Sequence, residues 1–202
     1  MRKSLAILAL SIASVFAAQS AKADDACSSV AGNLVANCGF ETGDFTGWSG
    51  TVLTDLFSGV DNLDPFSGND EAFLGNEGGN DTLFQTLNTV AGQAYTISFA
   101  LNNDADPSPG FPNDFSAAFG STGLVGLGFP ESDVAAGPYA VESFSAVATS
   151  STTNLTFTFE NVLGDFDLDS VSVVATPEPS SLMLLGTGAL GLLGAARRRL
   201  KR

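Results

Sequence analysis

The side chains of this chain that could do chemistry are mainly carboxylates. The 202 residues include 22 Asp or Glu, and all of these except Glu178 lie between Asp24 and Thr176, a stretch without Lys or Arg. Two carboxylates at a suitable separation can hydrolyse a glycosidic bond, and clusters of oxygen ligands bind Ca²⁺. With so many acids some pair always meets the glycosidase distance, so that pattern has little specificity. A bound cation is expected only where a carboxylate faces inward, away from water.

Two features of the composition exclude other chemistries. The chain has no His, which removes the usual base of serine-triad catalysis and a common metal ligand. All eight basic residues lie within residues 2–22 and 197–202, so the body between them is wholly acidic. Such a surface repels phosphate backbones, and we expect no nucleic-acid partner. We also expect no catalytic residues.

Asp169 is the first candidate for an inward-facing acid. Residues 167–174 alternate, and Asp169 has the same parity as Val171 and Val173, which are expected to point into the core. A buried carboxylate must accept hydrogen bonds, take a proton or bind a cation. Oxygen ligands without His or Cys nearby favour Ca²⁺. The alternative is that backbone amides satisfy Asp169 and the other acids are solvated edge residues.

Two further acidic runs resemble the beginning of EF-hand loops, at Asp165-x-Asp167-x-Asp169 and Asp104-x-Asp106-x-Ser108. Both lack the late Glu of that loop, and the first also has Ser170 at the Gly position. Ordinary turns, in which Asp and Ser side chains bond nearby backbone groups, explain both runs better. The second run lies in a long polar loop, residues 102–114, which we expect at a ligand-facing edge of the fold.

The body that must position these acids is expected to be all-β. Residues 95–101 and 155–159 alternate between large apolar and smaller side chains, and residues 33–174 contain no window with helical periodicity. Gly, Pro, Asn and Asp clusters separate the apolar runs. Further strands are expected at residues 34–37, 51–57, 71–74, 82–87, 115–119, 139–147 and 167–174. Roughly nine short strands fit a single domain, residues 24–175, folded as an antiparallel β-sandwich of the jelly-roll type.

The N-terminus has the pattern of a secretory signal peptide, which we assign to residues 1–23. Arg2 and Lys3 form its positive region, residues 5–16 its apolar region, and Ala21-Lys22-Ala23 its cleavage site. A membrane anchor is the alternative, but the apolar run is too short for one. We therefore expect cleavage before Asp24 and export of the body.

A second targeting segment, residues 176–202, ends the chain. A polar break is followed by an apolar run at residues 182–196 and then by basic residues. A helix of that length spans roughly 23 Å, less than the ~30 Å hydrocarbon core, but it inserts if the bilayer thins or the Arg side chains snorkel. We expect a short transmembrane helix in the inner membrane with its basic end in the cytoplasm. A buried core helix is the alternative.

The order of these parts resembles a PEP-CTERM sorting signal. The parts are Pro177-Glu178-Pro179, the Leu/Gly/Ala-rich run, and a basic end that includes Arg197, Arg198 and Arg199. Thr176 stands where members of the family often have Val. The resemblance implies processing by exosortase, a membrane transpeptidase of Gram-negative bacteria that make exopolysaccharide. It implies a transient membrane anchor and then a place at the cell surface or in the extracellular matrix.

The two cysteines suit an exported chain. Cys27 and Cys38 are close in sequence, and the oxidising compartment favours a disulfide between them. Such a bond stabilises a short loop by roughly 3 kcal/mol in the chain-entropy model. A two-ligand metal site is the alternative, which the lack of His makes less favourable.

The body resembles the jelly rolls of carbohydrate-binding modules. The similar pieces are residues 37–43, Gly47-Trp48, 67–68, 72, 75, 85–87, 92–93, 95–99 and 168–173. In that family a structural Ca²⁺ joins the Glu of an early Phe-Glu motif to an Asp of the last strand. The resemblance therefore implies Ca²⁺ ligands at Glu41 and Asp169, with a third acidic ligand at Asp70 or Glu71. Ser170 stands where Asp or Asn is usual.

These features together predict a non-catalytic protein of the cell surface or extracellular matrix, stabilised by Ca²⁺ and able to bind exopolysaccharide. Trp48 could stack on a sugar, but a core position suits its large apolar area better, and Tyr139 is the better candidate for an exposed aromatic. One alternative is a carboxylate-based glycoside hydrolase. Another is an ice-binding or adhesive surface, suggested only by Thr156 and Thr158.

Overall fold

The structure is a computed structural model that describes residues 24–120, 122–123, 134–177, 187 and 197. The expected signal peptide, Glu178 and Pro179, nearly all of the expected transmembrane helix, Arg198 and Arg199 lie outside the described residues. Among the described residues, no helix is long and apolar enough to cross a membrane.

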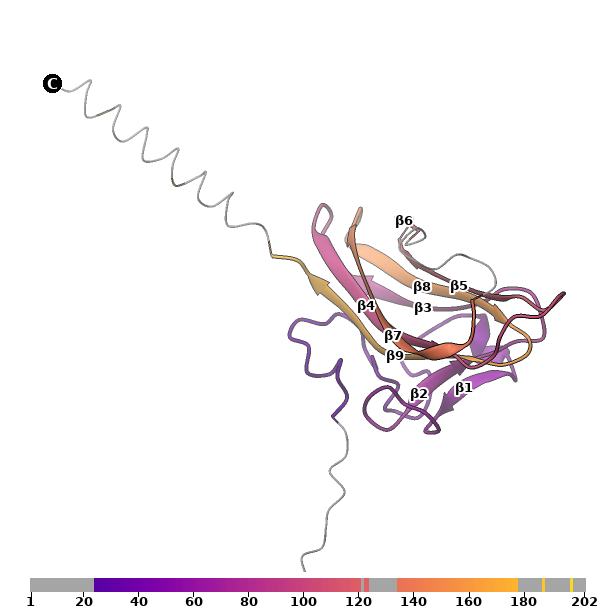
Figure 1. Cartoon of the computed structure of the whole chain (residues 1–202). Coiled ribbons are helices and arrows are strands. Elements are labelled where there is room, and N and C mark those ends of the chain that lie inside the picture. Colours follow the sequence, from indigo (N-terminus) through magenta and orange to yellow (C-terminus); the bar gives the residue numbers. More distant parts are fainter. Residues whose placement is uncertain (1–23, 121, 124–133, 178–186, 188–196, 198–202) are drawn as a thin grey trace, which may run out of the picture.

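The described residues form one short 3-10 helix and nine strands (Figure 1). In chain order these are η1 Thr51–Thr54, β1 Ser58–Asp61, β2 Glu71–Leu74, β3 Asp81–Asn88, β4 Ala94–Asn103, β5 Asn113–Phe119, β6 Thr122–Gly123, β7 Gly137–Val147, β8 Thr152–Asn161 and β9 Phe166–Ala175. All nine strands lie between residues 24 and 177, so this segment contains the whole described sandwich.

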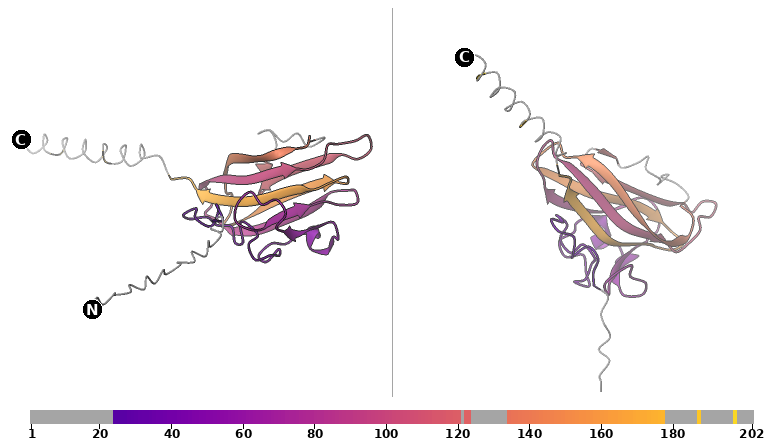
Figure 2. Two further views of the ribbon diagram at one scale, coloured as in Figure 1. Left: turned by 60° about the horizontal axis from the view of Figure 1, so that its bottom comes forward. Right: turned by 60° about the vertical axis from the view of Figure 1, so that its left-hand side comes forward.

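The strands form two antiparallel sheets that stack as layers (Figures 1 and 2). The five-stranded sheet has the order β1-β2-β9-β4-β7, and the four-stranded sheet has the order β3-β8-β5-β6. Alternation explains the packing, because Tyr95, Ile97, Phe99 and Leu101 of β4 are buried while the residues between them are more exposed or small. The prediction of an all-β antiparallel sandwich is confirmed.

The core between the sheets is mainly aromatic. Its wholly buried side chains include seven phenylalanines: Phe40, Phe99, Phe115, Phe119, Phe157, Phe159 and Phe166. Phe99 and Phe157 meet edge to face with ring centroids 5.1 Å apart. Trp48 is only 4 % exposed and stacks on Phe40 at 5.5 Å, so its ring is not presented to a ligand.

Two of the expected strands are wrong, and two strands, β1 and the two-residue β6, were not expected. Residues 34–37 make no strand because the Asn33 side chain, instead of a backbone ladder, bonds the Val171 carbonyl and the Val173 N–H. Residues 51–54 form η1, where the Thr51 hydroxyl accepts the N–H of Thr82 and ends the pairing with β3. Strand β1 was missed because Ser58-Gly59 has the composition of a turn.

The N-terminal segment, residues 24–50, joins β9 of the five-stranded sheet to β3, an edge strand of the four-stranded sheet. The N–H of Val171 on β9 donates to the Cys38 carbonyl at 2.9 Å, and the Leu34 N–H donates to the Val173 carbonyl at 3.0 Å. On the other side, the Gln85 amide of β3 bonds both backbone groups of Ala36. The segment therefore places Asp25 and Glu41 beside the end of β9 that carries Asp169.

A disulfide ties this segment to itself. Cys27 and Cys38 are bonded, with Cα atoms 6.0 Å apart, and both are buried. Neither sulfur is a thiolate, so the cysteines supply no metal ligand.

Candidate metal centre

Glu41 is held by the loop that precedes β2. Its carboxylate accepts hydrogen bonds from the Asn69 N–H at 2.6 Å, the Asn69 side-chain amide at 2.8 Å and the Asp70 N–H at 3.2 Å. Gly68 has φ 72°, and a Cβ at that position would overlap the Glu41 carboxylate. The loop can therefore close over Glu41 only with glycine at position 68.

Asp169 is wholly buried and is held by the same loop. Its carboxylate accepts the Ser67 N–H at 2.8 Å and the N–H of Ser170. A β-bulge puts it there, because β4 pairs Ser98 with Ser172 but Ala100 with Asp169, which leaves one extra residue in β9. Ser170 takes up the bulge with φ 53°. The strict parity with Val171 and Val173 was therefore the wrong reason for a correct expectation of burial.

Asp25 is a third acid of this group, and it was not identified from the sequence. Burial, and to a smaller extent the Glu41 charge, raise the pKa of Asp25. Burial also raises the pKa of Asp169 to about 6, with smaller contributions from Asp25 and Glu41. Gly39 makes room for Asp25, because a Cβ there would lie 2.6 Å from its Oδ1. We call Asp25, Glu41 and Asp169 the Glu41 site.

The other two predicted ligands lie differently. Asp70 contributes its backbone N–H to Glu41. Glu71 belongs to a different group of acids, because the charges that act on it are those of Asp61 and Asp167. Burial first, and then these neighbours, raise the pKa of Glu71 to about 8. We call Asp61, Asp64, Glu71 and Asp167 the Glu71 cluster.

The outer face of the five-stranded sheet has a shallow hollow of about 160 Å³. The hollow is bordered by apolar Phe66 and Val141 and by three serine side chains, Ser98, Ser170 and Ser172. Phe66 packs against Tyr139 with ring centroids 5.4 Å apart and ring planes inclined at 55°. Phe66 is 41 % exposed, whereas the Tyr139 hydroxyl is buried. Phe66, which the sequence did not single out, is therefore the accessible aromatic of this face.

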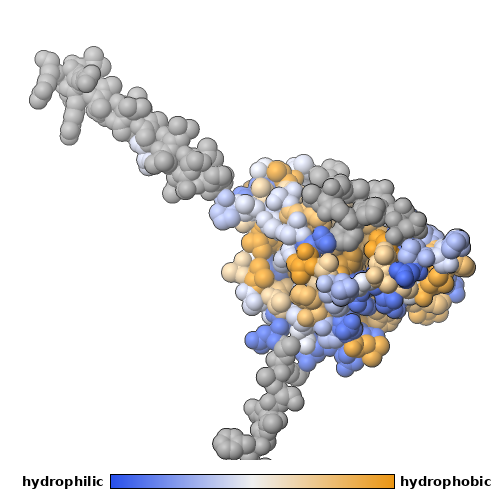
Figure 3. Space-filling model, in the orientation of Figure 1, coloured by the Kyte–Doolittle hydropathy of each residue, from blue (hydrophilic) through white to orange (hydrophobic). Residues whose placement is uncertain are grey.

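The surface is not uniformly polar (Figure 3). Hydrophilic residues gather around the lower part of that view, over the region where Figure 1 places β1 and β2, and apolar patches lie between them. The two groups of acids described above lie in this part of the fold.

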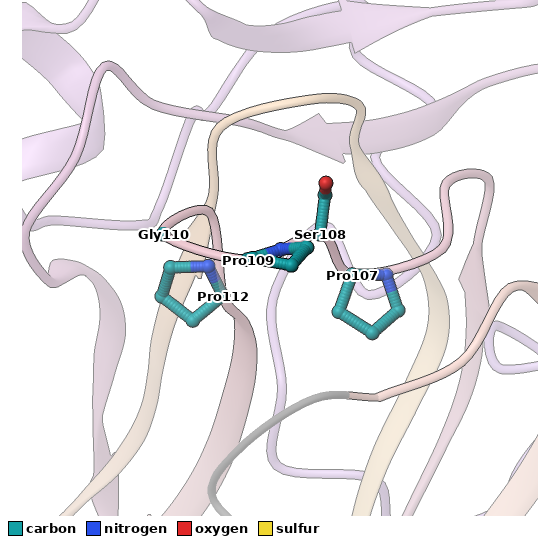
Figure 4. A pocket seen from close by; sticks show the side chains of 5 residues that line it. All are labelled: Pro107, Ser108, Pro109, Gly110 and Pro112. Atoms are coloured by element: carbon teal, nitrogen blue, oxygen red, sulfur yellow. The ribbon is translucent and has the colours of Figure 1, made fainter.

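A larger hollow, about 400 Å³, lies in the loop between β4 and β5 (Figure 4). The expected polar loop at residues 102–114 is partly taken up by these two strands, and the remaining turn lines the hollow with Pro107, Ser108, Pro109, Gly110 and Pro112. Among the residues that the structure describes, no charged or aromatic side chain lines it.

Comparison with known proteins identifies the end of the chain and the fold of the body. Residues 175–199 match the PEP-CTERM protein-sorting motif. The body is similar to a family 16 carbohydrate-binding module, with a TM-score of 0.52 and 14 % identity over 70 % of this chain and 99 % of that one. No curated protein matches the sequence.

Two further solved structures are similar. One is the enzymatically active domain of tailspike protein 4 from bacteriophage CBA120, with a TM-score of 0.51 and 12 % identity over 71 % of this chain but only 21 % of that chain. The other is the xylan-binding CBM22-1 domain of Xyn10C from Paenibacillus barcinonensis, with a TM-score of 0.49 and 15 % identity over 70 % of this chain and 93 % of that one. At this level of identity the similarity to the family 16 module shows the fold alone, a β-sandwich of the carbohydrate-binding-module type.

Proposed function

We propose that the mature protein is a non-catalytic component of the cell surface or extracellular matrix that binds polysaccharide and is stabilised by Ca²⁺. The observation that carries this proposal is the sorting motif at residues 175–199, which follows directly on the last strand of the sandwich. An exported module of this fold, sorted to the outside of a cell that makes exopolysaccharide, is suited to hold that polymer.

The proposed processing has two steps. Cleavage before Asp24 removes residues 1–23, and the body, residues 24–175, folds outside the inner membrane. Residues 176–202 anchor it there through the short apolar helix until exosortase cuts near Pro177-Glu178-Pro179. The match to the sorting motif supports the second step.

The proposed polysaccharide site is the outer face of the five-stranded sheet. Phe66 offers an accessible ring on which the apolar side of a sugar can stack, and the neighbouring serine hydroxyls can bond sugar hydroxyls. A shallow, open surface suits a chain of sugars better than a single small molecule.

The Glu41 site is the proposed structural Ca²⁺ site. Asp25, Glu41 and Asp169 supply oxygen ligands from the N-terminal segment and from β9, and Gly68 lets the loop before β2 close over Glu41. Each carboxylate can accept backbone N–H groups with some of its lone pairs and bind a cation with others. A bound Ca²⁺ would neutralise buried acids that have no Lys or Arg to pair with in residues 24–176.

Binding of exopolysaccharide to residues 24–177, measured by affinity electrophoresis and on a glycan array, tests the proposed site. We expect Phe66→Ala to weaken binding about tenfold, as the loss of one stacked aromatic implies. Phe111→Ala is the matched control, because Phe111 is similarly exposed, at 44 %, but lies in the β4–β5 loop. Equal affinities of the two variants would refute the site.

The hydrolase alternative is tested on the same samples. Asp169 is wholly buried and bonded to amides, which does not suit an acid that must meet a substrate. We expect no release of reducing sugar from the polysaccharide. Release that depends on one carboxylate pair would favour the hydrolase over the binding protein.

A further inference from the structure

The Glu71 cluster forms across three neighbouring strands of the five-stranded sheet. Asp61 of β1 is the register partner of Glu71 on β2, and Asp167 of β9 is the partner of Phe73, two residues further along β2. Their neighbours Ala72 and Leu168 are buried in the core, so Glu71 and Asp167 face the opposite, outer side of the sheet. Register therefore places three carboxylates side by side there.

The loop between β1 and β2 closes over this group. Glu71 is only 1 % exposed, and one of its oxygens, Oε1, accepts the Asp64 N–H at 2.9 Å. Asp61 accepts the Leu63 N–H at 3.0 Å, which holds the start of the same loop. On the other side of the cluster, the Asn102 amide donates to Asp167 at 3.1 Å. The acids are thus enclosed by structure and are not spread over a solvated surface.

Two buried polar atoms at this cluster have no hydrogen-bond partner among the described residues. They are Oε2 of Glu71 and the hydroxyl oxygen of Tyr139. The carboxylates that act on Tyr139 include Asp167, Glu71 and Asp64, so its hydroxyl belongs to the same environment. A buried carboxylate oxygen without a partner is costly, and in this fold the partner cannot be a Lys or Arg, since residues 24–176 contain neither. Oε2 of Glu71 therefore needs either a proton shared with Asp61 or a group from outside the polypeptide.

We propose that Asp61, Glu71 and Asp167 bind a Ca²⁺ ion on the outer face of the five-stranded sheet, in a site separate from the Glu41 site. The ligands are all carboxylate oxygens, which suits Ca²⁺, an ion that takes six to eight oxygen ligands in an adaptable geometry. Oε2 of Glu71 is a direct ligand, and the Tyr139 hydroxyl donates to a carboxylate or a water of the ion. The ion fixes the β1–β2 loop, which also carries Phe66.

Counting the Ca²⁺ ions bound to residues 24–177, by calorimetry and native mass spectrometry, tests this site. We expect Glu71→Gln to bind one ion fewer than the unchanged protein. Glu77→Gln is the matched control, because Glu77 is exposed and the charge change is the same. Far-UV circular dichroism verifies the fold of each variant, and Asp61→Asn replaces Glu71→Gln if the latter does not fold.

The possible results separate the two sites. If Glu71→Gln and Glu77→Gln bind the same number of ions, the cluster is neutralised by a proton shared between Glu71 and Asp61, and the proposal is wrong. If the unchanged protein binds no Ca²⁺ at all, both the Glu41 site and this site are refuted. If Glu71→Gln loses one ion and keeps another, the second site is established, and the remaining ion belongs to the Glu41 site.

Discussion

The Glu41 site and the Glu71 cluster each include an acid of β9, Asp169 and Asp167, and consist of the same residue types, yet they are built differently. The carboxylates of Glu41 and Asp169 receive backbone N–H groups from residues 67, 69, 70 and 170. Glu71 receives one such bond, and its other oxygen has no partner among the described residues. Both groups contain a buried acid, and residues 24–176 have no Lys or Arg to pair with it. Whether the backbone satisfies such an acid depends on whether a loop or bulge turns amides toward it.

The largest effect is expected at the loop that supplies those amides. Gly68→Ala forces a Cβ into the Glu41 carboxylate at φ 72°, so we expect about 3 kcal/mol of lost stability, from a left-handed alanine plus a broken hydrogen-bond group. Gly43→Ala is the control, because Gly43 also has φ 72° but nothing within 4 Å of the added Cβ. Urea unfolding measures both. Equal losses would mean that the loop does not hold Glu41.

The second largest effect is the change in stability when one acid of each region is replaced by its amide, and its direction should differ between the two regions. In EDTA at pH 8, we expect Asp169→Asn to lose about 1–3 kcal/mol, because an amide cannot accept both the Ser67 and the Ser170 N–H with equal strength. In the same buffer Glu71→Gln should be neutral or stabilising, since it removes a buried charge that faces Asp61 and Asp167. Thermal unfolding of the two variants compares them. Losses of the same sign and size would show that the two regions are not different.

The smallest effect is the dependence on pH. The folded pKa of Glu71 is about 8, that of Asp167 about 7, and those of Asp165 and Asp169 about 6, all above the ordinary values near 4. Burial is the main cause in each case. The folded protein then holds more protons than the unfolded chain between about pH 4 and pH 8, so in EDTA its stability falls as pH rises through that range. Stability that rises with pH in EDTA would contradict these shifts.

Ca²⁺ should weaken this dependence, because a bound cation replaces the protons. Melting temperatures measured every half pH unit, with EDTA and with Ca²⁺, give the two profiles. In Glu71→Gln the fall in melting temperature between about pH 7 and pH 8 should be smaller even in EDTA, since Glu71 has the highest pKa of these four acids.

The strands could be predicted where side-chain alternation is strong. β4 and β8 carry large apolar residues at every second position of their central parts, and both form with ends one to three residues outside the expected ranges. The short strand β1 could not be predicted, because Gly59 is there to make room for the Phe73 ring of the neighbouring strand. That requirement belongs to the pairing of β1 with β2 and leaves no mark in the local sequence.

For the acids, the sequence predicted that Asp169 is buried but did not predict its contacts or which acids lie beside it. Asp169 was expected to be buried, and it is, but the bulge at Ser170 that aims it at the Ser67 amide depends on the register with β4. Asp25 joins Glu41 because the disulfide folds the N-terminal segment back on itself, and Gly39 beside Cys38 is the one local sign of it. Asp70 and Glu71 are adjacent in sequence, yet Asp70 lies in the loop before β2 and gives its backbone N–H to Glu41, whereas Glu71 begins β2 and lies opposite Asp61 of β1.

The measurement that tests the central claim most directly is the melting temperature of residues 24–177 in EDTA, in Ca²⁺, and in NaCl of the same ionic strength as the Ca²⁺ buffer. The account holds that Ca²⁺ neutralises the buried acids that have no Lys or Arg beside them. An ion concentration 100 times the dissociation constant then stabilises the fold by about 2.7 kcal/mol per site, which raises the melting temperature by about 5–10 °C. NaCl, which only screens the exposed charges, should give a much smaller rise. Equal melting temperatures in Ca²⁺ and NaCl would contradict the account.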